Sequence, residues 1–134
     1  MAADTRLVPL DRDECLMLLE LETVGRVAVA SGRNAPVMIP VSFLMNDESP
    51  VFRTEEPSVV SALGGGVISL QVDRFDWYRH TGWSVLVTGI AEEVSEVEAS
   101  DPDDRLRAVR IRVSQITGRL IKLDPMPVEA GGYQ

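Results

Sequence analysis

The sequence predicts a mainly β protein, built as a small antiparallel barrel with short helical caps. Three observations favour this fold class: about six short apolar segments have strand character, only two segments have helical character, and the connections between strands are hairpin-like. Closing the strands into a barrel would also pair edges that an open sheet exposes. The 134 residues suit one domain, and no repeat or linker divides them, so we expect a single domain over 1–134.

Two segments predict helices. Residues 11–22, DRDECLMLLELE, begin with Asp11 and Glu14 at the spacing of a capping box, and they carry an apolar face. A glycine within the next few residues is a stop signal. The second helix is short and covers about 57–63, because Pro57 suits a first helical turn and the glycines at 64–66 end it.

Residues 24–54 predict an antiparallel meander whose strands are separated by polar turns. Its three strands cover 24–31, 35–45 and 51–54. The middle strand carries Pro36 and Pro40, which do not fit a fully hydrogen-bonded central strand. The two prolines indicate an edge, a bulge, or a strand whose backbone groups face something other than a neighbouring strand.

Three further strands are predicted beyond the short helix, and they cover 67–75, 83–97 and 108–121. The last alternates apolar and polar residues in its first half, as a half-buried strand does. Gly89 marks a bend or bulge in the strand 83–97. Between these strands we expect a loop at 76–82 and an acidic turn at 98–106.

The charge and the cysteine content limit the partners and the compartment. A formal net charge of −8 and scattered basic residues argue against a nucleic-acid or anionic-membrane binder. No apolar run approaches the roughly 18 residues of a membrane span. Cys15 is the only cysteine, and the first residues lack the apolar core of a signal peptide. We therefore expect a cytoplasmic protein.

No enzyme motif of fixed spacing is present, so the sequence assigns no catalytic residue and no metal ligand. Cys15 lies on the apolar side of a helix, which favours a buried small hydrophobe over a nucleophile. His80 is either a solvated loop histidine or a pocket residue beside Trp83. The acidic pairs at 92–93 and 101–104 have the pattern of a solvated surface.

Three aromatic residues gather around one predicted loop. Trp77, Tyr78 and Trp83 fall within seven residues of each other. They either cap one end of the barrel or form a wall for a flat conjugated ligand, because aromatic faces stack on such rings.

The stretch VFRTEEPSVVSAL, residues 51–63, suits a phosphate. It is a strand that delivers Arg53, Thr54 and Ser58 to the start of a helical turn. A stacking wall together with a phosphate site indicates a nucleotide-like cofactor.

Several segments resemble the pyridoxamine 5′-phosphate oxidase-like family, and they follow one another in that family's order. They are TVGRVAVA, PVMIPVSF, VFRTEEPSVVSAL, VISLQVDRFD, TGWSVLVTGIAEEV and RIRVSQITGRLI. The resemblance is closest to a short bacterial branch that is similar to the nitroimidazole-resistance reductases. It covers a core of about 10–121 and leaves 122–134 as an irregular tail; TGWSV at 81–85 and ITGR at 116–119 are its most specific motifs.

The resemblance implies a six-stranded split β-barrel that forms a homodimer and binds one flavin mononucleotide (FMN) in each of two clefts between the subunits. The isoalloxazine ring would lie along the backbone of 37–42, and the segment 53–60 would hold the phosphate. The segment 83–85 would belong to the cleft wall, contributed by the partner subunit. The cofactor-binding residues implied in this way are Pro40, Val41, Ser42, Phe52, Arg53, Thr54, Ser58, Trp83 and Ser84.

One position departs from the family pattern. The branch has a phosphate-binding lysine where this chain has Val59. Losing one charge-assisted contact costs about 1.5–3 kcal/mol, which predicts weak FMN binding or a preference for FAD or a deazaflavin. Other cations could compensate, and lysine in place of Val59 should tighten FMN binding. The candidate compensating cations are Arg26, Arg33, Arg74 and Arg79.

The function that the resemblance implies is a flavin-dependent oxidoreductase acting on a small molecule of unknown identity. The alternative is a non-catalytic dimeric module of the same fold, which binds a flavin, a deazaflavin or haem, or has a degenerate cleft.

Overall fold

The computed structural model describes residues 4–94 and 105–124, and every structural statement below concerns these residues. They form β-strands and two short helices. The elements are β1 (Thr5–Leu10), α1 (Arg12–Leu19), β2 (Val24–Ser31), β3 (Asn34–Asn46), β4 (Ser49–Thr54), α2 (Pro57–Ala62), β5 (Val67–Asp76), β6 (Thr81–Glu93) and β7 (Arg107–Leu123).

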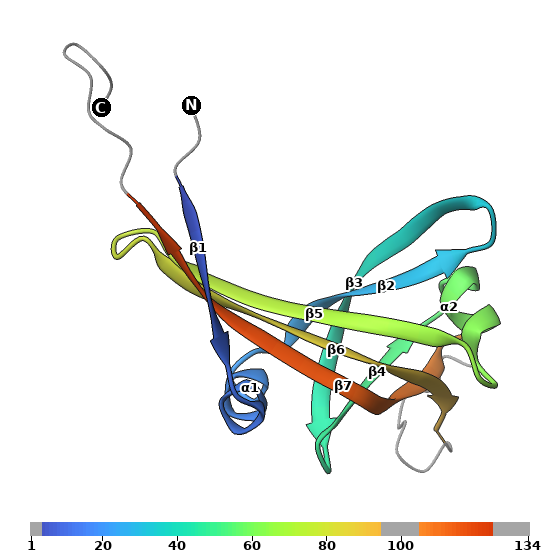
Figure 1. Ribbon diagram of the computed structural model, residues 1–134. Helices are drawn as coiled ribbons and strands as arrows, with labels where there is room; N and C mark the ends of the chain where they lie inside the picture. The colour runs from blue at the N-terminus through green and yellow to red at the C-terminus, as the bar shows by residue number, and fades with distance from the viewer. Residues whose placement is uncertain (1–3, 95–104, 125–134) are drawn as a thin grey trace.

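All the strands join one antiparallel sheet in the order β1-β7-β4-β3-β2-β5-β6. An additional pairing between β6 and β7 closes six of them into a barrel, which leaves β1 outside (Figure 1). The predicted fold class, a mainly β split barrel with short capping helices, is confirmed. No helix in the described ranges is long and apolar enough to cross a membrane.

The strand β1 was not predicted. It pairs with the far end of β7, from Thr5 opposite Leu123 to Leu10 opposite Gly118. Its residues are nearly all exposed, so it lacks the alternation of apolar and polar residues that identifies a half-buried strand. The same pairing extends β7 to residue 123, two residues into the expected irregular tail. The rest of that tail, 125–134, lies outside the described residues.

The loop and turn between the later strands also differ from the prediction. The loop expected at 76–82 is a tighter hairpin, because Thr81 and Gly82 pair with Asp76 and Phe75. The expected bulge is present, since the register of β6 against β7 shifts between Thr88 and Gly89. Residues 95–97 of the predicted strand and most of the acidic turn at 98–106 lie outside the described residues.

The helix α1 closes one end of the barrel. Its capping box is confirmed: the Glu14 amide donates to Asp11 Oδ1 at 2.9 Å, and the Asp11 amide donates to Glu14 Oε1 at 3.4 Å. Cys15 and Leu19 are fully buried, whereas Leu21 is 64% exposed, so the helix ends three residues earlier than predicted. Burial raises the pKa of the Cys15 thiol, and nearby Asp11 adds to this. Cys15 is therefore a packing residue.

Gly118 sets how closely α1 approaches the barrel. A Cβ atom built at this position would overlap Cys15 Sγ and would meet Val85 at 3.4 Å. The strand β7 therefore needs glycine at the point where the helix crosses it.

The helix α2 lies at the other end of the barrel, and its buried residue is Val59. Val59 is 0% exposed and belongs to the core cluster. The burial of Val59 argues against the expectation that lysine at this position would tighten FMN binding, because a lysine there would bury its charge.

We predict that Gly118→Ala lowers the free energy of unfolding by about 1–3 kcal/mol, because the added methyl group overlaps the Cys15 thiol. Cys15→Ala removes that overlap, so Gly118→Ala should cost less in the Cys15→Ala background. Urea unfolding of the four proteins in this double-mutant cycle measures the coupling. Strictly additive losses would contradict the contact.

We also predict that Val59→Lys lowers the free energy of unfolding by roughly 3 kcal/mol or more, since it buries an unpaired charge. The matched control is Val67→Lys at the exposed start of β5, where Val67 is 60% exposed. The control should change stability by no more than about 0.5 kcal/mol. Equal stability of the two variants in urea would show that Val59 does not face the core.

Candidate functional site

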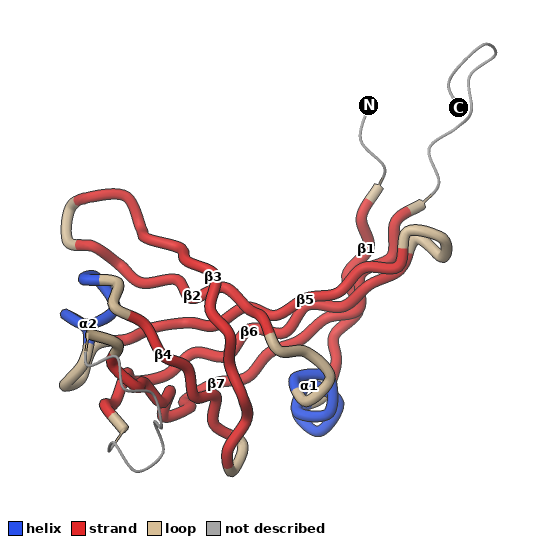
Figure 2. The backbone as a smooth tube through the Cα atoms, turned by 180° about the vertical axis from the view of Figure 1, so that it is seen from behind, coloured by secondary structure: helices blue, strands red, loops and turns tan. Residues whose placement is uncertain are grey.

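The strands β3 and β4 separate at one end of the barrel. β4 pairs with β3 only over 43–46 of β3, and its last residues, Arg53 and Thr54, pair with β7 alone. β3 continues beyond this point with β2 as its partner. Within the described part of the chain, the β4-facing edge of β3 from 36 to 42 therefore has no neighbouring strand. The tube in Figure 2 shows β4 leaving β3 toward α2.

The backbone groups on this open edge of β3 follow from the register. The Phe43 amide donates to Thr23 O at 2.9 Å, so the odd-numbered residues of β3 direct their N–H and C=O groups toward β2. The even-numbered residues direct theirs toward the open edge. Pro40 is even-numbered, so the N–H group that it lacks is not missing from the pairing with β2, whereas Pro36 lies where the register between β2 and β3 shifts.

The open edge therefore offers a specific set of hydrogen-bonding groups. Between residues 36 and 42 its N–H donors come only from Met38 and Ser42, while every even-numbered residue supplies a carbonyl acceptor. The expectation that the prolines mark a strand with backbone groups facing something other than a strand agrees with this geometry. The prolines also prevent another β-strand from pairing along the whole edge.

The side chains of the predicted site residues near this edge point in two directions. Val41, Phe52 and Thr54 are 6%, 2% and 7% exposed, and they point into the barrel. Only the backbones of Val41 and Phe52 could contact a ligand outside it. Pro40 and Ser42 are exposed on the outer face of β3.

A pocket lies where β4 ends and α2 begins. It is lined by Thr54, Glu55, Glu56, Pro57, Ile39 and Arg105. The Glu56 amide donates to Thr54 Oγ1 at 3.0 Å, which fixes the turn after the strand. Arg105 Nε lies 3.8 Å from Glu55 Oε2. The pocket therefore combines a guanidinium with two carboxyl groups.

The other two predicted phosphate-binding residues lie near this pocket but do not line it. Arg53 is half-buried on the outer face of β4, and its Nε is shielded from solvent. Ser58 is half-buried in the first turn of α2. The turn that the sequence prediction named thus lines a pocket, and Arg105 lines the same pocket.

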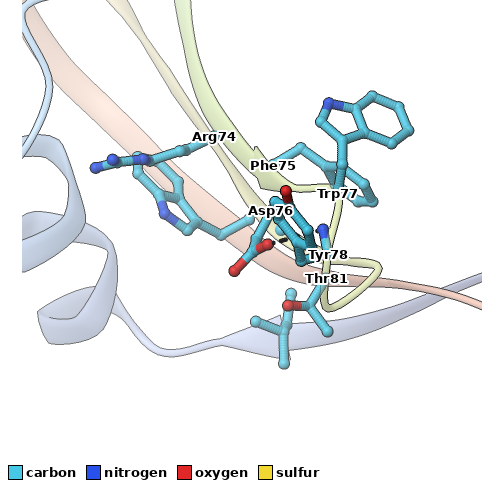
Figure 3. A pocket seen from close by; sticks show the side chains of 9 residues that line it. Arg74, Phe75, Asp76, Trp77, Tyr78 and Thr81 are labelled. Atoms are coloured by element: carbon cyan, nitrogen blue, oxygen red, sulfur yellow. Dashed lines mark hydrogen bonds between the residues drawn. The ribbon is translucent and has the colours of Figure 1, made fainter.

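A second pocket lies at the β5–β6 hairpin tip (Figure 3). Trp77 is 73% exposed and packs edge-on against Phe75, with ring centroids 4.4 Å apart. Asp76 accepts hydrogen bonds from two amides of the turn, at 3.0 and 3.2 Å. His80 is exposed, has φ of 53° and does not line this pocket, which agrees with a solvated loop histidine. The lining residues are Arg74, Phe75, Asp76, Trp77, Tyr78, Thr81, Gly82, Trp83 and Leu120.

Ser84 lies next to this tip on the outer face of the sheet. Gln71 Nε2 donates to Ser84 Oγ at 3.0 Å. A shallow surface pocket surrounds Ser84, and Leu7 and Leu86 contribute apolar side chains to it. Trp83 lines the hairpin pocket and packs against the core, whereas Ser84 lines the surface pocket, so these two predicted residues face opposite sides of β6.

One chain does not bring the predicted phosphate-binding and cleft-wall residues together. Thr54 pairs with residue 107 of β7, whereas Trp83 pairs with residue 120 of the same strand. At about 3.3 Å per residue, these points lie roughly 40 Å apart along β7. A site that uses both groups would need a second copy of the chain.

Three of the four arginines considered as compensating cations form ion pairs with other residues. The pairs Arg26–Asp73, Arg74–Glu22 and Arg79–Asp76 have N–O distances of 3.3, 3.4 and 3.8 Å. None of these arginines lines the pocket after β4.

The acids at 92–93 lie in ion pairs at the end of β6. Glu92 pairs with Arg112 at 2.6 Å, and Glu93 accepts two hydrogen bonds from Arg107. These hydrogen bonds hold the pKa of the Glu93 carboxyl below its usual range. The two acids act as surface ion-pair partners. No group of three or more metal-ligating side chains was found within the described ranges.

The chain is similar to several known proteins. It is 41% identical over 98 residues to an uncharacterised protein of Mycobacterium tuberculosis, a match that covers 69% of this chain and 64% of that protein's length. The structure is similar to that of an FAD-binding protein from Mycobacterium smegmatis, with a TM-score of 0.69, 30% identity and coverage of 86% of this chain and 98% of the other.

A third comparison supports the fold alone. An FAD-binding protein from Mesorhizobium loti has a TM-score of 0.69 and 22% identity, with coverage of 89% of this chain and 99% of the other.

Residues 11–127 match the pyridoxamine 5′-phosphate oxidase family, and this match spans the barrel and both helices. The chain therefore belongs to the pyridoxamine 5′-phosphate oxidase family.

Proposed function

We propose that this protein binds a flavin nucleotide in a cleft between two copies of the chain and uses it for oxidation or reduction of a small molecule. The open edge of β3 is the observation that carries the proposal. The similarity to the M. smegmatis FAD-binding protein, at 30% identity over most of both chains, supports it. A cytoplasmic location is part of the same proposal.

A flavin ring suits the open edge of β3. One side of the isoalloxazine carries a carbonyl, an N–H and a second carbonyl, which match the amide donors and carbonyl acceptors of an unpaired strand edge. The Ser42 amide would donate to one flavin carbonyl, and the Pro40 carbonyl would accept from the flavin N–H. The Met38 amide lies about 13 Å farther along the strand, so it would face another part of the flavin. Bound flavin supplies the hydride chemistry, while the chain binds the ring, orients it and excludes water.

The pocket after β4 would receive the phosphate end of the nucleotide. Its carboxyl groups, from Glu55 and Glu56, repel a phosphate, and this repulsion should be weaker for FAD because its diphosphate spreads a charge of about −2 over two groups, whereas FMN carries it on one. We therefore propose both flavins as ligands and expect FAD to bind at least as tightly as FMN. A deazaflavin is the third ligand to test.

The second half of the cleft would come from the partner copy. Trp83 and Ser84 lie far from Thr54 within one chain, so the wall opposite the open edge would be the Trp83 face of the other chain. Such an arrangement gives two equivalent clefts, because a twofold interface repeats every contact.

We expect the purified protein to bind FMN and FAD with dissociation constants in the micromolar range or below, and riboflavin more weakly. Calorimetry and the visible absorption spectrum, recorded before and after adding each flavin, provide the measurement. A protein that stays colourless and binds none of these flavins or a deazaflavin would refute the proposal. Reduction of bound flavin by NADH, NADPH or a reduced deazaflavin separates an oxidoreductase from a non-catalytic flavin-binding module.

We also expect complementation between two defective variants. Arg53→Ala removes a guanidinium that lies beside the phosphate pocket, and Trp83→Ala removes the aromatic side chain of the opposite wall, so each variant alone should bind FMN poorly. When the two are unfolded, mixed equally and refolded, mixed dimers carry one intact cleft, and about a quarter of all clefts should bind FMN normally.

Fluorescence titration with FMN counts the restored sites, and each variant refolded alone is the control. Thermal unfolding of both variants checks that they fold. If the mixture binds no more FMN than the separate variants do, the cleft does not lie between two chains.

A further inference from the structure

We propose that the hairpin pocket, at the tip formed by β5 and β6, binds a planar aromatic ring that carries a neutral N–H donor, such as a carboxamide or an amino group. None of its lining residues lines the pocket after β4. Trp83 also belongs to the wall of the proposed flavin cleft, but the hairpin pocket lies within one chain. The inference therefore goes beyond the flavin function and does not require a bound flavin.

The hairpin pocket has the size and the lining of a small-molecule site. Its volume is about 480 Å³, within the range of roughly 300–1,000 Å³ that is typical of ligand pockets. Aromatic and aliphatic side chains make up most of the lining, and the polar groups come from Arg74, Asp76 and Thr81. A few polar groups in a mostly apolar site fix the orientation of a ligand.

The sheet register places a ring and these polar groups on one face of the hairpin. Arg74 pairs with Trp83, Asp76 pairs with Thr81, and directly opposed residues share a face. Leu120 of β7 pairs with Trp83 and joins the same face. Figure 3 shows the Asp76 carboxylate on the same side of the hairpin as Arg74 and Thr81. Trp83 and Leu120 therefore form an apolar floor beside the polar groups.

The aromatic rings of the opposite face pack against each other. Phe75 pairs with Gly82, where a Cβ atom would overlap the Phe75 ring, and Trp77 packs edge-on against Phe75. Tyr78 lies in the turn, lines the pocket and is 98% exposed. Its ring is thus free to cover a planar ligand that stacks on Trp83.

One carboxylate oxygen of the pocket is available to an N–H donor. Asp76 Oδ1 accepts the two amides of the turn, at 3.0 and 3.2 Å. Among the described residues no hydrogen bond reaches Oδ2; Arg79 Nε lies 3.8 Å from it, beyond hydrogen-bond distance, on a side chain that is 82% exposed. Because an ionised carboxylate only accepts hydrogen bonds, Oδ2 favours a ligand with an N–H group.

The charges of the lining favour a neutral ligand. The lining carries one cation and one anion, Arg74 and Asp76, and each has an ion-pair partner outside the pocket, Glu22 and Arg79. A charged ligand would add an unmatched charge to this balanced set. A neutral carboxamide can instead donate to Asp76 and accept from Arg74 or Thr81.

Nicotinamide and nicotinate are matched probes, because they share a ring and differ in the group that would face Asp76. The measurement is tryptophan fluorescence of the full-length Trp77→Phe variant without flavin, in which Trp83 is the only tryptophan. Nicotinamide should quench Trp83 with a dissociation constant in roughly the millimolar range, as expected for so small a ligand. Nicotinate should bind at least about fivefold more weakly, because its carboxylate is repelled by Asp76 and has no N–H group.

Three further substitutions, each made in the Trp77→Phe background, test the assignment. Asp76→Asn keeps an oxygen for the turn amides and removes the charge, so the two probes should then bind within about twofold of each other. Asp73→Asn is the matched control, because Asp73 pairs with Ser84 on the opposite face, and it should leave both dissociation constants within about twofold. Tyr78→Ser should weaken both probes alike, since it removes a stacking ring. Thermal unfolding confirms that each variant folds.

Three results would overturn the inference. The first is no quenching of Trp83 by either probe, the second is equal binding of the two probes before the charge of Asp76 is removed, and the third is the same change in Asp73→Asn as in Asp76→Asn. A protein that discriminates between the probes as expected and binds no flavin would refute the flavin function and leave this inference in place.

Discussion

The pairing of β3 is the constraint on which the rest of the molecule depends. Pro40 removes an N–H group from the edge of this strand that faces away from β2, and β4 pairs with β3 only over 43–46. The end of β4 pairs with β7 alone, and this pairing is part of the barrel's closure. Pro40 thus lies on the edge of β3 that is open where the barrel splits.

The separation of β4 from β3 also determines which charged side chains a ligand would meet. The end of β4 lies beside the start of β7. This places Thr54, the acidic turn after it and Arg105 around one pocket. A charged ligand there meets one guanidinium and two carboxyl groups, whereas Arg107 and Arg112 near this end pair with Glu93 and Glu92. Affinity at this pocket would depend on local pairing and not on the net charge of −8.

Much of the barrel could be predicted from the sequence, because its strands obey simple rules. Alternating and valine-rich segments identified the six barrel strands, and Asp11 with Glu14 identified the start of α1. β1 was missed because its exposed residues show no alternation, and its partner on β7 is more than 100 residues away. The burial of Val59 could not be read from the resemblance, because a resemblance gives a position in the chain but not the direction of a side chain.

In the candidate site, too, residues that are contiguous in sequence could be predicted, whereas residues that strand pairing brings together could not. The segment 53–58 was identified from residue types alone, because strand, turn and helix are contiguous in sequence. Arg105 was missed because it is a single arginine after an acidic run, and only the register between β4 and β7 brings it to the pocket. The separation of Trp83 from Thr54 likewise follows from their pairing along β7 and from nothing local in the sequence.

The most direct test of this account is amide hydrogen exchange at the open edge of β3, resolved by residue with NMR in the absence and presence of FMN. The account predicts that the amides of Met38 and Ser42 exchange fast in the flavin-free protein and that at least the Ser42 amide becomes protected when FMN is added. The amides of Ile39 and Val41, which face β2, should be protected in both states. Unchanged exchange at Met38 and Ser42 in protein saturated with FMN would contradict the central claim that this edge holds the flavin ring.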